Sequence, residues 1–154
     1  MSEIPADLPT PSSPRLRAAL DVNLQLLDVA DRLRAHWNAT ARSHGLSGVQ
    51  IKLLLSLAAD DTLTMRSLAE RLRYDASNLT TLVDRLEHDG LIQRSAHPTD
   101  RRVTEVRLTP DGRRIRDEFW IALNSNGPLD PLTSNQLKKL RDALSHVLHS
   151  PQQA

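Results

Sequence analysis

The spacing of the apolar residues changes once along this chain of 154 residues, and that change limits what the chain can fold into. From residue 64 to residue 88 the apolar side chains recur every three or four positions, which is typical of amphipathic helices. After Gly90 they alternate, since Val106 and Leu108 are separated by Arg107 as in a half-buried strand. The sequence therefore predicts short helices followed at once by short strands.

Two short helices are predicted on either side of a three-residue connection at residues 73–75. Thr64 is expected to cap the first helix and Asp75 the second, because both side chains accept hydrogen bonds from free N–H groups. Gly90 is typical of the left-handed residue that ends a helix. The apolar face of the second helix consists of Leu79, Leu82, Val83 and Leu86. We interpret the pair as a helix-turn-helix.

A hairpin is predicted directly after the helix pair. Its strands span residues 91–95 and 103–108, and polar, turn-forming residues occupy the tip at 96–102. Taken alone, a helix pair is more often plain core packing, and a charged tip is usually only a solvated loop. The order of helix, turn, helix, glycine stop, strand, arginine tip and strand is more specific. It indicates a winged helix-turn-helix.

Further helices flank this unit and open with capping signals. A helix is expected from residue 14 to about residue 42, with an apolar surface wide enough to pack against both its own core and a partner subunit. Ser47 with Gln50 fits a capping box for a helix that ends at residues 60–61. Two more helices are expected to begin at residues 109 and 133. The predicted fold class is mainly α with a small β-wing: a winged helix-turn-helix lobe plus N- and C-terminal helices.

Composition excludes several classes of function. The chain has no cysteine, which excludes a disulfide scaffold, a thiol nucleophile and thiol-based peroxide sensing. It contains no phosphate loop and no G-x-S-x-G or H-E-x-x-H motif, so we predict no enzymatic activity and no cofactor. His146 and His149 can share a helix face, but we interpret them as solvated side chains rather than metal ligands.

No segment resembles an export leader or a membrane anchor. The first 14 residues hold four prolines and predict a flexible, Pro-rich tail. No apolar run approaches the roughly 18–20 residues that a membrane-spanning helix needs. We therefore expect a cytoplasmic protein.

Charge is distributed unevenly along the chain. The net charge of +1 argues, taken as a sum, against nucleic-acid binding. Residues 91–116, however, hold seven arginines against three acids, a net charge of +4, which leaves −3 for the remainder. The basic charge is thus concentrated on and just after the predicted wing, where a phosphate-facing surface is expected.

Five stretches carry a family resemblance, and they are LSGVQ at 46–50, SLAERL at 67–72, LVDRLEHDGLI at 82–92, DRR at 100–102 and LTPDG at 108–112. On these residues the chain resembles the MarR family of bacterial transcription regulators. The resemblance implies a homodimer with intertwined terminal helices and two winged lobes on a pseudo-palindromic operator. It implies four parts: the tail at 1–14, an N-terminal dimerisation helix at 15–45, a DNA-binding lobe at 46–112, and C-terminal dimerisation helices at 113–150.

The candidate DNA-binding residues fall into three groups. Arg102 is the first choice for insertion into a minor groove, whose narrow form concentrates negative potential, and Asp100 is expected to hold the wing tip in shape. Small polar side chains at the start of the second helix suit the reading of base edges in a major groove. The predicted readers are Ser77, Asn78, Thr80 and Thr81, and the predicted backbone contacts are Arg66, Ser67, Arg73, Arg85 and Arg101.

Alternatives remain for the flanking arginines and for the operator. Arg85 is equally a structural ion-pair partner of Asp84, Glu87 or Asp89, and Arg94 and Arg107 are interpretable as paired strand charges. Family members commonly carry a basic residue after the recognition-helix threonine, whereas Thr80 is followed by Thr81 in this chain. A threonine cannot donate the two parallel hydrogen bonds that an arginine donates to guanine, so the operator sequence of relatives cannot be assumed for this chain.

A ligand crevice between the dimerisation helices and the lobe is also implied by the resemblance. An apolar pocket with a few polar groups suits a small aromatic or phenolic effector. The candidate ligand-binding residues are His36, Trp37, Phe119, Trp120 and Leu123. The alternative is that Trp37, Phe119 and Trp120 belong to a dimer core.

The sequence thus predicts a homodimeric regulator, most often a repressor, that binds double-stranded operator DNA and is released by a small molecule. The alternative is a winged-helix protein-interaction module that does not touch DNA. The arginine-tipped wing and the polar face of the second helix favour the first reading.

Overall fold

The computed structural model describes residues 13–58, 62–125 and 127–150. The predicted tail, apart from residues 13 and 14, and the predicted helix stop at residues 60–61 lie outside these ranges. The elements follow in the order α1 (Pro14–Ser43), α2 (Gly48–Ser56), β1 (Leu63–Thr64), α3 (Met65–Leu72), α4 (Ala76–His88), β2 (Ile92–Ala96), β3 (Thr104–Leu108), α5 (Pro110–Leu123) and α6 (Ser134–His149).

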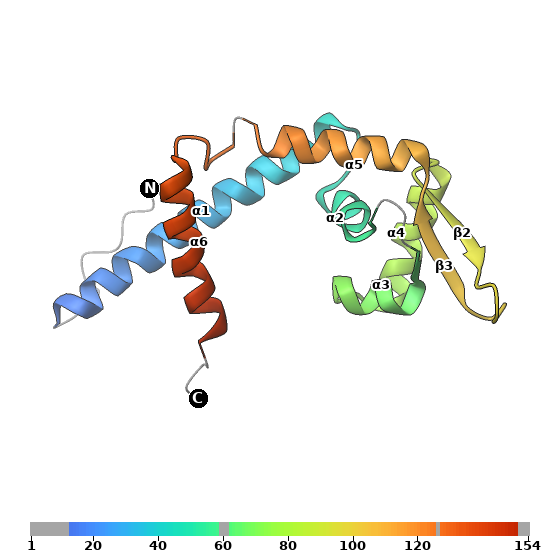
Figure 1. Ribbon diagram of the computed structural model, residues 1–154, viewed down its shortest axis with the longest axis horizontal. Coiled ribbons are helices and arrows are strands. Elements are labelled where there is room, and N and C mark those ends of the chain that lie inside the picture. The colour runs from blue at the N-terminus through green and yellow to red at the C-terminus, as the bar shows by residue number, and fades with distance from the viewer. Residues whose placement is uncertain (1–12, 59–61, 126, 151–154) are drawn as a thin grey trace.

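The elements divide into a lobe and an extended arm (Figure 1). The lobe contains α2, α3, α4 and the hairpin of β2 and β3, and it lies along one side of α5. The arm consists of α1 and α6, which extend away from the lobe on the other side of the molecule. The predicted fold class is confirmed.

One hydrophobic core holds the lobe together. Every element from α2 to α5 except β1 contributes to it, and Phe119 anchors α5 in it with no exposed surface. The other fully buried large side chains are Ile51, Leu53, Leu54, Leu57, Leu68, Leu79, Leu86, Ile92, Val83 and Val106. The apolar face predicted for the second helix is buried as expected, because Leu79, Leu82, Val83 and Leu86 all belong to this core.

The hairpin belongs to a three-stranded antiparallel sheet in the order β1-β3-β2. In its register Ile92 faces Leu108 and Arg94 faces Val106, and the buried Ile92, Val106 and Leu108 hold the base of the hairpin against the lobe. The two predicted strands are confirmed to within one residue at each end. The sequence analysis missed β1, because a strand of two residues carries no hydrophobic period.

Most of the predicted helix signals are confirmed. Ser47 with Gln50 and Thr133 with Gln136 form complete capping boxes. Gly90 has a φ of +70°, and Leu91 N–H bonds to Leu86 C=O at 2.9 Å, so α4 ends in the expected left-handed stop.

Asp75 is an exception among the caps. It occupies the N-cap position of α4 with extended backbone, but its side chain makes no capping hydrogen bond. Asp75 therefore stabilises α4 through the negative charge of its carboxylate near the positive end of the helix dipole, and not through a capping hydrogen bond.

The arm leaves much apolar surface uncovered in the single protomer. Of the 30 residues of α1 only Thr40 and Ala41 are buried, and no residue of α6 is buried. The large exposed apolar residues of α1 are Leu16, Leu20, Val22, Leu24, Leu27, Val29 and Leu33. None of the helices in the described ranges combines the length and apolar character that crossing a membrane requires.

Candidate nucleic-acid interface

The first half of α4 presents a continuous polar surface. Ser77, Asn78, Thr80 and Thr81 are all exposed, as the sequence analysis predicts for a base-reading face. The hydroxyl of Thr80 donates to Ala76 C=O at 2.8 Å, and that of Thr81 donates to Ser77 C=O at 3.3 Å. Each hydroxyl oxygen keeps its acceptor capacity, so these side chains can accept a hydrogen bond from a base amino group without leaving the helix.

Arg73 makes the turn between α3 and α4. Its φ of +55° is left-handed, and it is the only non-glycine residue with positive φ among the described residues. Its N–H bonds to Glu70 C=O at 3.3 Å, and the next N–H, of Tyr74, bonds to Ala69 C=O at 3.0 Å. This closes α3 abruptly and leaves the Arg73 side chain exposed beside the start of α4.

The wing tip is held by its acid. Asp100 Oδ1 accepts from the backbone N–H of Arg102 at 3.0 Å, and Asp100 C=O accepts from Val103 N–H at 3.0 Å. The carboxylate thus shapes the turn through the backbone, and it leaves the guanidinium of Arg102 free. Arg101 and Arg102 are both exposed at the tip.

The arginines of the lobe separate into engaged and unengaged groups. Arg94 of β2 forms ion pairs with Asp84 and Glu87 of α4, and Arg107 bonds to Gln93 at 3.0 Å. Their interpretation as structural charges of the strands agrees with these contacts. Arg66 is exposed but pairs with Glu70 at 3.0 Å.

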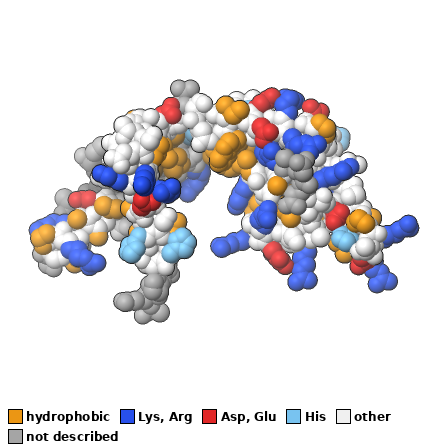
Figure 2. All heavy atoms as spheres, in the orientation of Figure 1, with side chains coloured by type: hydrophobic (Ala, Val, Ile, Leu, Met, Phe, Trp, Pro, Cys, Tyr) orange, Lys and Arg blue, Asp and Glu red, His pale blue; other side chains and the backbone are white. Residues whose placement is uncertain are grey.

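Within the described part of the chain, Arg15, Arg17 and Arg42 of α1 have unengaged guanidinium groups, and so do four other arginines, which belong to the lobe and its wing. They are Arg73, Arg85, Arg101 and Arg102. The alternative pairing of Arg85 with Asp84, Glu87 or Asp89 does not occur in the described structure, where Arg94 pairs with the first two of these acids. Figure 2 shows Lys and Arg side chains projecting from the lower margin of the lobe and from the end of the hairpin.

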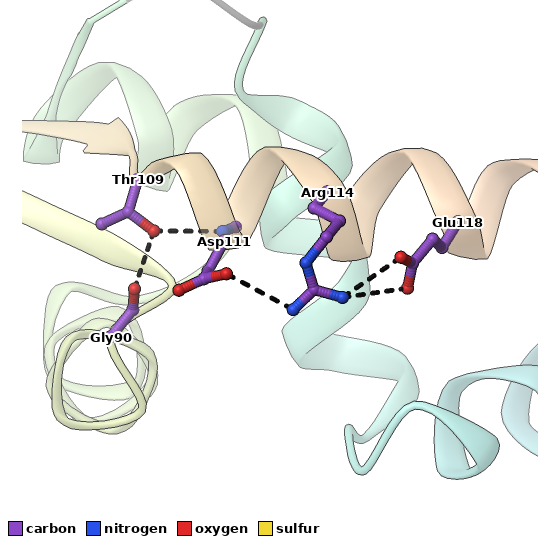
Figure 3. Close-up of polar contacts among 6 residues, drawn as sticks. Gly90, Thr109, Asp111, Arg114 and Glu118 are labelled. Carbon is purple, nitrogen blue, oxygen red and sulfur yellow. Dashed lines mark hydrogen bonds and ion pairs between the residues drawn. The ribbon is translucent and has the colours of Figure 1, made fainter.

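The charge of residues 91–116 is less concentrated than the sequence sum suggests. Arg114 lies between Asp111 and Glu118 on α5, and Figure 3 shows its guanidinium reaching both (Arg114 Nη1 to Glu118 Oε1 3.1 Å). The hydrogen bond to Glu118, and then that to Asp111, raises the pKa of Arg114 above its ordinary value. This arginine is neutralised within α5, so the free charge of the segment belongs to the wing tip.

The LTPDG stretch at 108–112 fixes the wing to the end of the recognition helix (Figure 3). Thr109 Oγ1 donates to Gly90 C=O at 2.7 Å and accepts from Gly112 N–H at 3.0 Å, while Thr109 N–H bonds to Leu91 C=O at 3.1 Å. One threonine therefore caps α5 and binds the turn that ends α4.

Two arginines hold the end of α2 from different helices. Arg71 of α3 donates to Ser56 C=O at 2.6 Å, and Arg116 of α5 donates to Leu57 C=O at 2.9 Å. Both carbonyls lie at the negative end of the α2 dipole, where cations are favoured. The position of α2 is therefore tied to both α3 and α5.

A surface hollow of about 440 Å³ lies between α2 and α4. Asn78, Thr81 and Arg85 line one side, and Ser47, Val49 and Tyr74 line the rest. The sequence analysis did not include these last three residues in the candidate interface. No local signal marks them, because tertiary packing brings the start of α2 beside α4.

The five candidate ligand-binding residues do not lie together. His36, Trp37 and Leu123 line a cavity of about 340 Å³ where α1 meets the connection between α5 and α6. Phe119 is fully buried beneath it, with its ring 5.0 Å from that of Trp37 in an edge-to-face arrangement. Trp120 points outward, 56% exposed, and does not line the cavity. The expectation that all five line one crevice is corrected to three.

The cavity is completed by residues that the sequence analysis missed. They are Leu33, Asn124, Gly127, Pro128, Leu129, Asp130, Leu132 and Leu137. Most come from the connection between α5 and α6, which has no periodic pattern to predict where it folds back. Within the described ranges, no three His, Cys, Asp or Glu side chains gather where they could hold a metal ion.

Comparison with known proteins assigns this architecture to a family. The model of the MarR family matches residues 46–104. The organic hydroperoxide resistance transcriptional regulator of Bacillus subtilis is 31% identical over 101 residues, which cover 66% of this chain and 69% of that protein. This chain belongs to the MarR family. Its proposed resemblance to that family is therefore confirmed.

Other members of the MarR family show how far the likeness extends. The HTH-type transcriptional repressor MdtR of Bacillus subtilis is 30% identical over 92 residues, 60% of this chain and 59% of that protein. The chain thus spans about three fifths to two thirds of the length of these relatives. Sco3205 of Streptomyces coelicolor, a MarR family transcriptional regulator solved in complex with DNA, has a TM-score of 0.68 at 27% identity, covering 86% of this chain and 90% of that one. These relatives are transcriptional regulators, not enzymes.

Proposed function

We propose that this MarR family chain is a sequence-specific, double-stranded DNA-binding transcriptional repressor that acts as a homodimer on a pseudo-palindromic operator in the cytoplasm. One observation carries the proposal. In the lobe and its wing, four arginines have unengaged guanidinium groups, and these arginines, Arg73, Arg85, Arg101 and Arg102, belong to the turn, to α4 and to the wing tip. Internal partners neutralise Arg94 of β2 and Arg114 of α5, so the unpaired arginine charge of the lobe lies where a DNA backbone would approach.

The proposed division of roles follows from side-chain chemistry. Ser77, Asn78, Thr80 and Thr81 read base edges in the major groove, since they are small, polar and exposed at the start of α4. Arg102 enters the minor groove, and Asp100 holds the turn that presents it. The proposed backbone contacts are Arg66, Ser67, Arg73, Arg85 and Arg101.

The dimer is proposed from the uncovered apolar surface of the arm. Helix α1 exposes seven large apolar residues, and α6 exposes Leu137, Val147 and Leu148. Contiguous apolar surface of this kind marks an interface rather than a solvent-facing helix. We therefore assign residues 15–45 and 113–150 to dimerisation and 46–112 to DNA binding.

Salt dependence tests the proposed function against a protein-interaction module. Binding of the purified protein to a fluorescent duplex is measured by anisotropy at increasing salt concentrations. If each protomer places Arg73, Arg85 and Arg101 on phosphates, the dimer makes about six such contacts, and the logarithm of the affinity falls against the logarithm of salt with a slope of about −5. A protein that shows no duplex binding at low salt is a protein-interaction module instead.

Replacing Arg102 by alanine is expected to weaken binding to the operator by about 1–3 kcal/mol, the range for a good groove contact. Its guanidinium has no partner in the described structure, so the substitution removes a contact to DNA without breaking one in the protein. The operator is first selected from random duplexes, and affinity is then measured by anisotropy. Arg141→Ala on α6, which removes the same charge from a side chain paired with Asp142, serves as the matched control. Equal isotherms for the Arg102 variant and the wild type contradict the assignment.

Release by a small molecule is the third part of the proposal, with His36, Trp37 and Leu123 as the ligand-binding residues. Trp37 supports this role, because its Nε1–H bonds to Gly48 C=O at 3.0 Å at the start of α2. A Cβ on Gly48 would lie 2.3 Å from Asn38 Oδ1, so the contact between α1 and α2 is close. A ligand that moves Trp37 therefore also moves α2. It changes DNA affinity only by the difference in its own affinity for the two arrangements.

A further inference from the structure

The first two turns of α4 carry no side chain that can donate two parallel hydrogen bonds to one base. No arginine or lysine occurs between Arg73 and Arg85, and the exposed positions at the start of α4 hold small polar side chains instead. Guanine presents two adjacent acceptors, N7 and O6, in the major groove, and arginine and lysine are the side chains that match both. This stretch of α4 therefore lacks a close complement for guanine.

Hydrogen bonds within α4 already use the hydroxyl protons of its two threonines. Thr80 Oγ1 donates to Ala76 C=O at 2.8 Å, and Thr81 Oγ1 donates to Ser77 C=O at 3.3 Å. Each exposed side chain therefore offers a base an acceptor oxygen and a methyl group. The oxygen fits the amino group of adenine or of cytosine equally well, but only thymine carries a methyl group that the threonine methyl can contact. The two threonines thus favour A·T over G·C pairs.

Asn78 complements adenine more closely than guanine. Its side chain is exposed and makes no hydrogen bond to another described residue. A carboxamide places an acceptor oxygen beside an N–H₂ group, which matches the N6 amino group and the N7 acceptor of adenine at the same time. Guanine offers acceptors at both positions, so the amide oxygen finds no donor there and the two-bond match is lost. Asn78 therefore favours an adenine.

The remaining polar side chains of α4 and its cap do not distinguish the two kinds of base pair. The carboxylate of Asp75 makes no capping hydrogen bond and only accepts, so it suits the amino group of adenine or of cytosine. The hydroxyl of Ser77 both donates and accepts, and it fits any pair. Arg85 lies seven residues beyond Asn78, whereas recognition helices contact bases through their N-terminal residues, so Arg85 keeps its proposed contact with the DNA backbone.

The wing tip adds a preference of the same kind from the minor groove. The guanidinium of Arg102 is unengaged among the described residues, and Asp100 holds the backbone turn that presents it. Runs of A·T pairs have a narrow minor groove with enhanced negative potential, which attracts an inserted arginine. A G·C pair instead places the N2 amino group of guanine on the floor of that groove. Both base-reading parts of the lobe therefore favour A·T pairs.

We propose that each operator half-site carries A·T pairs beneath Asn78, Thr80 and Thr81, and a run of A·T pairs beneath Arg102. The inference rests on the proposed function, and it names the class of operator that this interface reads. In the major groove, adenine bonds to Asn78 while thymine methyl groups contact the methyl groups of the two threonines. In the minor groove, the narrow A·T run receives the guanidinium of the wing.

Base analogues test the two grooves separately. Binding sites are selected from random duplexes with the full-length protein, and each A·T pair of the half-site is then replaced in turn. Inosine·cytosine combines the major-groove groups of G·C with the minor-groove edge of A·T, and 2,6-diaminopurine·thymine does the reverse. Beneath α4, inosine·cytosine is expected to weaken binding about tenfold and diaminopurine·thymine by no more than about twofold. Beneath the wing the order is reversed, and Arg102→Ala removes the effect of diaminopurine there. Selection of G·C pairs, or equal binding to all replacements, overturns the proposal.

A pair of methyl deletions tests the contact between threonine and thymine. Replacing a contacted thymine by uracil is expected to weaken binding of the wild type about fourfold, the factor that corresponds to burial of one methyl group. Thr80→Ser or Thr81→Ser keeps the hydroxyl but removes the protein methyl, so the variant is expected to lose that response at the base pair it reads. Thr133→Ser makes the same change at the N-cap of α6, where serine also caps, and keeps the response. An undiminished response in both α4 variants overturns the proposal.

The failure of this inference is distinguishable from the failure of the proposed function. A protein that binds no duplex at low salt is not a DNA-binding regulator, and the proposed operator class is then wrong as well. A protein that binds duplexes with the expected salt dependence, but selects G·C pairs beneath α4, remains a DNA-binding protein and refutes the A·T inference alone. If Arg85→Ala abolishes such a G·C preference, Arg85 reads the guanine instead of contacting the backbone.

Discussion

Replacing Gly112 by alanine is expected to destabilise the protein by about 3 kcal/mol or more, the range for an overpacked position where backbone must move. A Cβ at this position would lie 1.9 Å from the carbonyl oxygen of Leu91 and 2.9 Å from its carbonyl carbon. Neither atom belongs to a flexible side chain. Accommodation would separate α5 from the end of α4 and break the hydrogen bonds that Thr109 makes there. Urea unfolding at fixed protein concentration measures the loss.

Gly90→Ala is the matched control for that result. Gly90 is left-handed at φ +70°, but a Cβ there meets nothing within 4 Å. Alanine at this position is therefore expected to lower the free energy of unfolding by only about 1 kcal/mol, the cost of a left-handed backbone conformation. Comparing the loss of unfolding free energy at Gly90 and at Gly112 therefore distinguishes the cost of the steric clash from the cost of the left-handed backbone. Equal losses at Gly90 and Gly112 would show that the close approach of α5 is not what requires Gly112.

The double substitution Leu20→Glu and Leu27→Glu is expected to convert the proposed dimer into monomers and to weaken operator binding by at least about a hundredfold. The two side chains are 39% and 64% exposed in the single protomer and lie seven residues apart on one face of α1. Burial of each leucine contributes about 1.5–3 kcal/mol to association, and a buried unpaired glutamate opposes it. Sedimentation velocity measures the mass, and anisotropy measures the affinity.

Gln25→Glu with Arg32→Gln provides the control for the arm. These residues have the same spacing but lie on the polar stripe of α1 with Asp21 and Asp28, and the two changes alter the net charge by the same amount. This variant is expected to remain dimeric. If both double variants dissociate, charge repulsion along α1 is the cause, and the leucine face is not the interface.

Local signals made much of the lobe predictable from sequence. Each of four N-cap side chains accepts the expected hydrogen bond from the backbone N–H three residues further along the chain. They are Ser47, Thr64, Thr109 and Thr133. The stop at Gly90 is equally local. Asp75 has the right residue type and position, but its side chain makes no such bond, since residue type alone does not set the rotamer.

Features that depend on distant segments were not predictable in the same way. Arg94 pairs with Asp84 and Glu87, ten and seven residues away, so sequence proximity to Arg85 did not reveal which arginine these acids join. Strand β1 forms because its backbone pairs with that of β3, with Leu63 opposite Val106. The candidate ligand-binding residues were chosen by helix rather than by helix face, and for that reason they included Phe119 and Trp120, neither of which lines the cavity.

The paired contacts of Arg71 and Arg116 at the end of α2 have a mechanical consequence. Helices α3 and α5 both donate to adjacent carbonyls at the end of α2, and Thr109 joins α5 to the end of α4. We therefore expect the lobe and α5 to move together as one body. A change at the base of α5 then rotates the whole lobe and leaves its internal distances as they are. In a dimer, spin labels within one lobe would keep their separation, while labels on the two lobes would report the full motion.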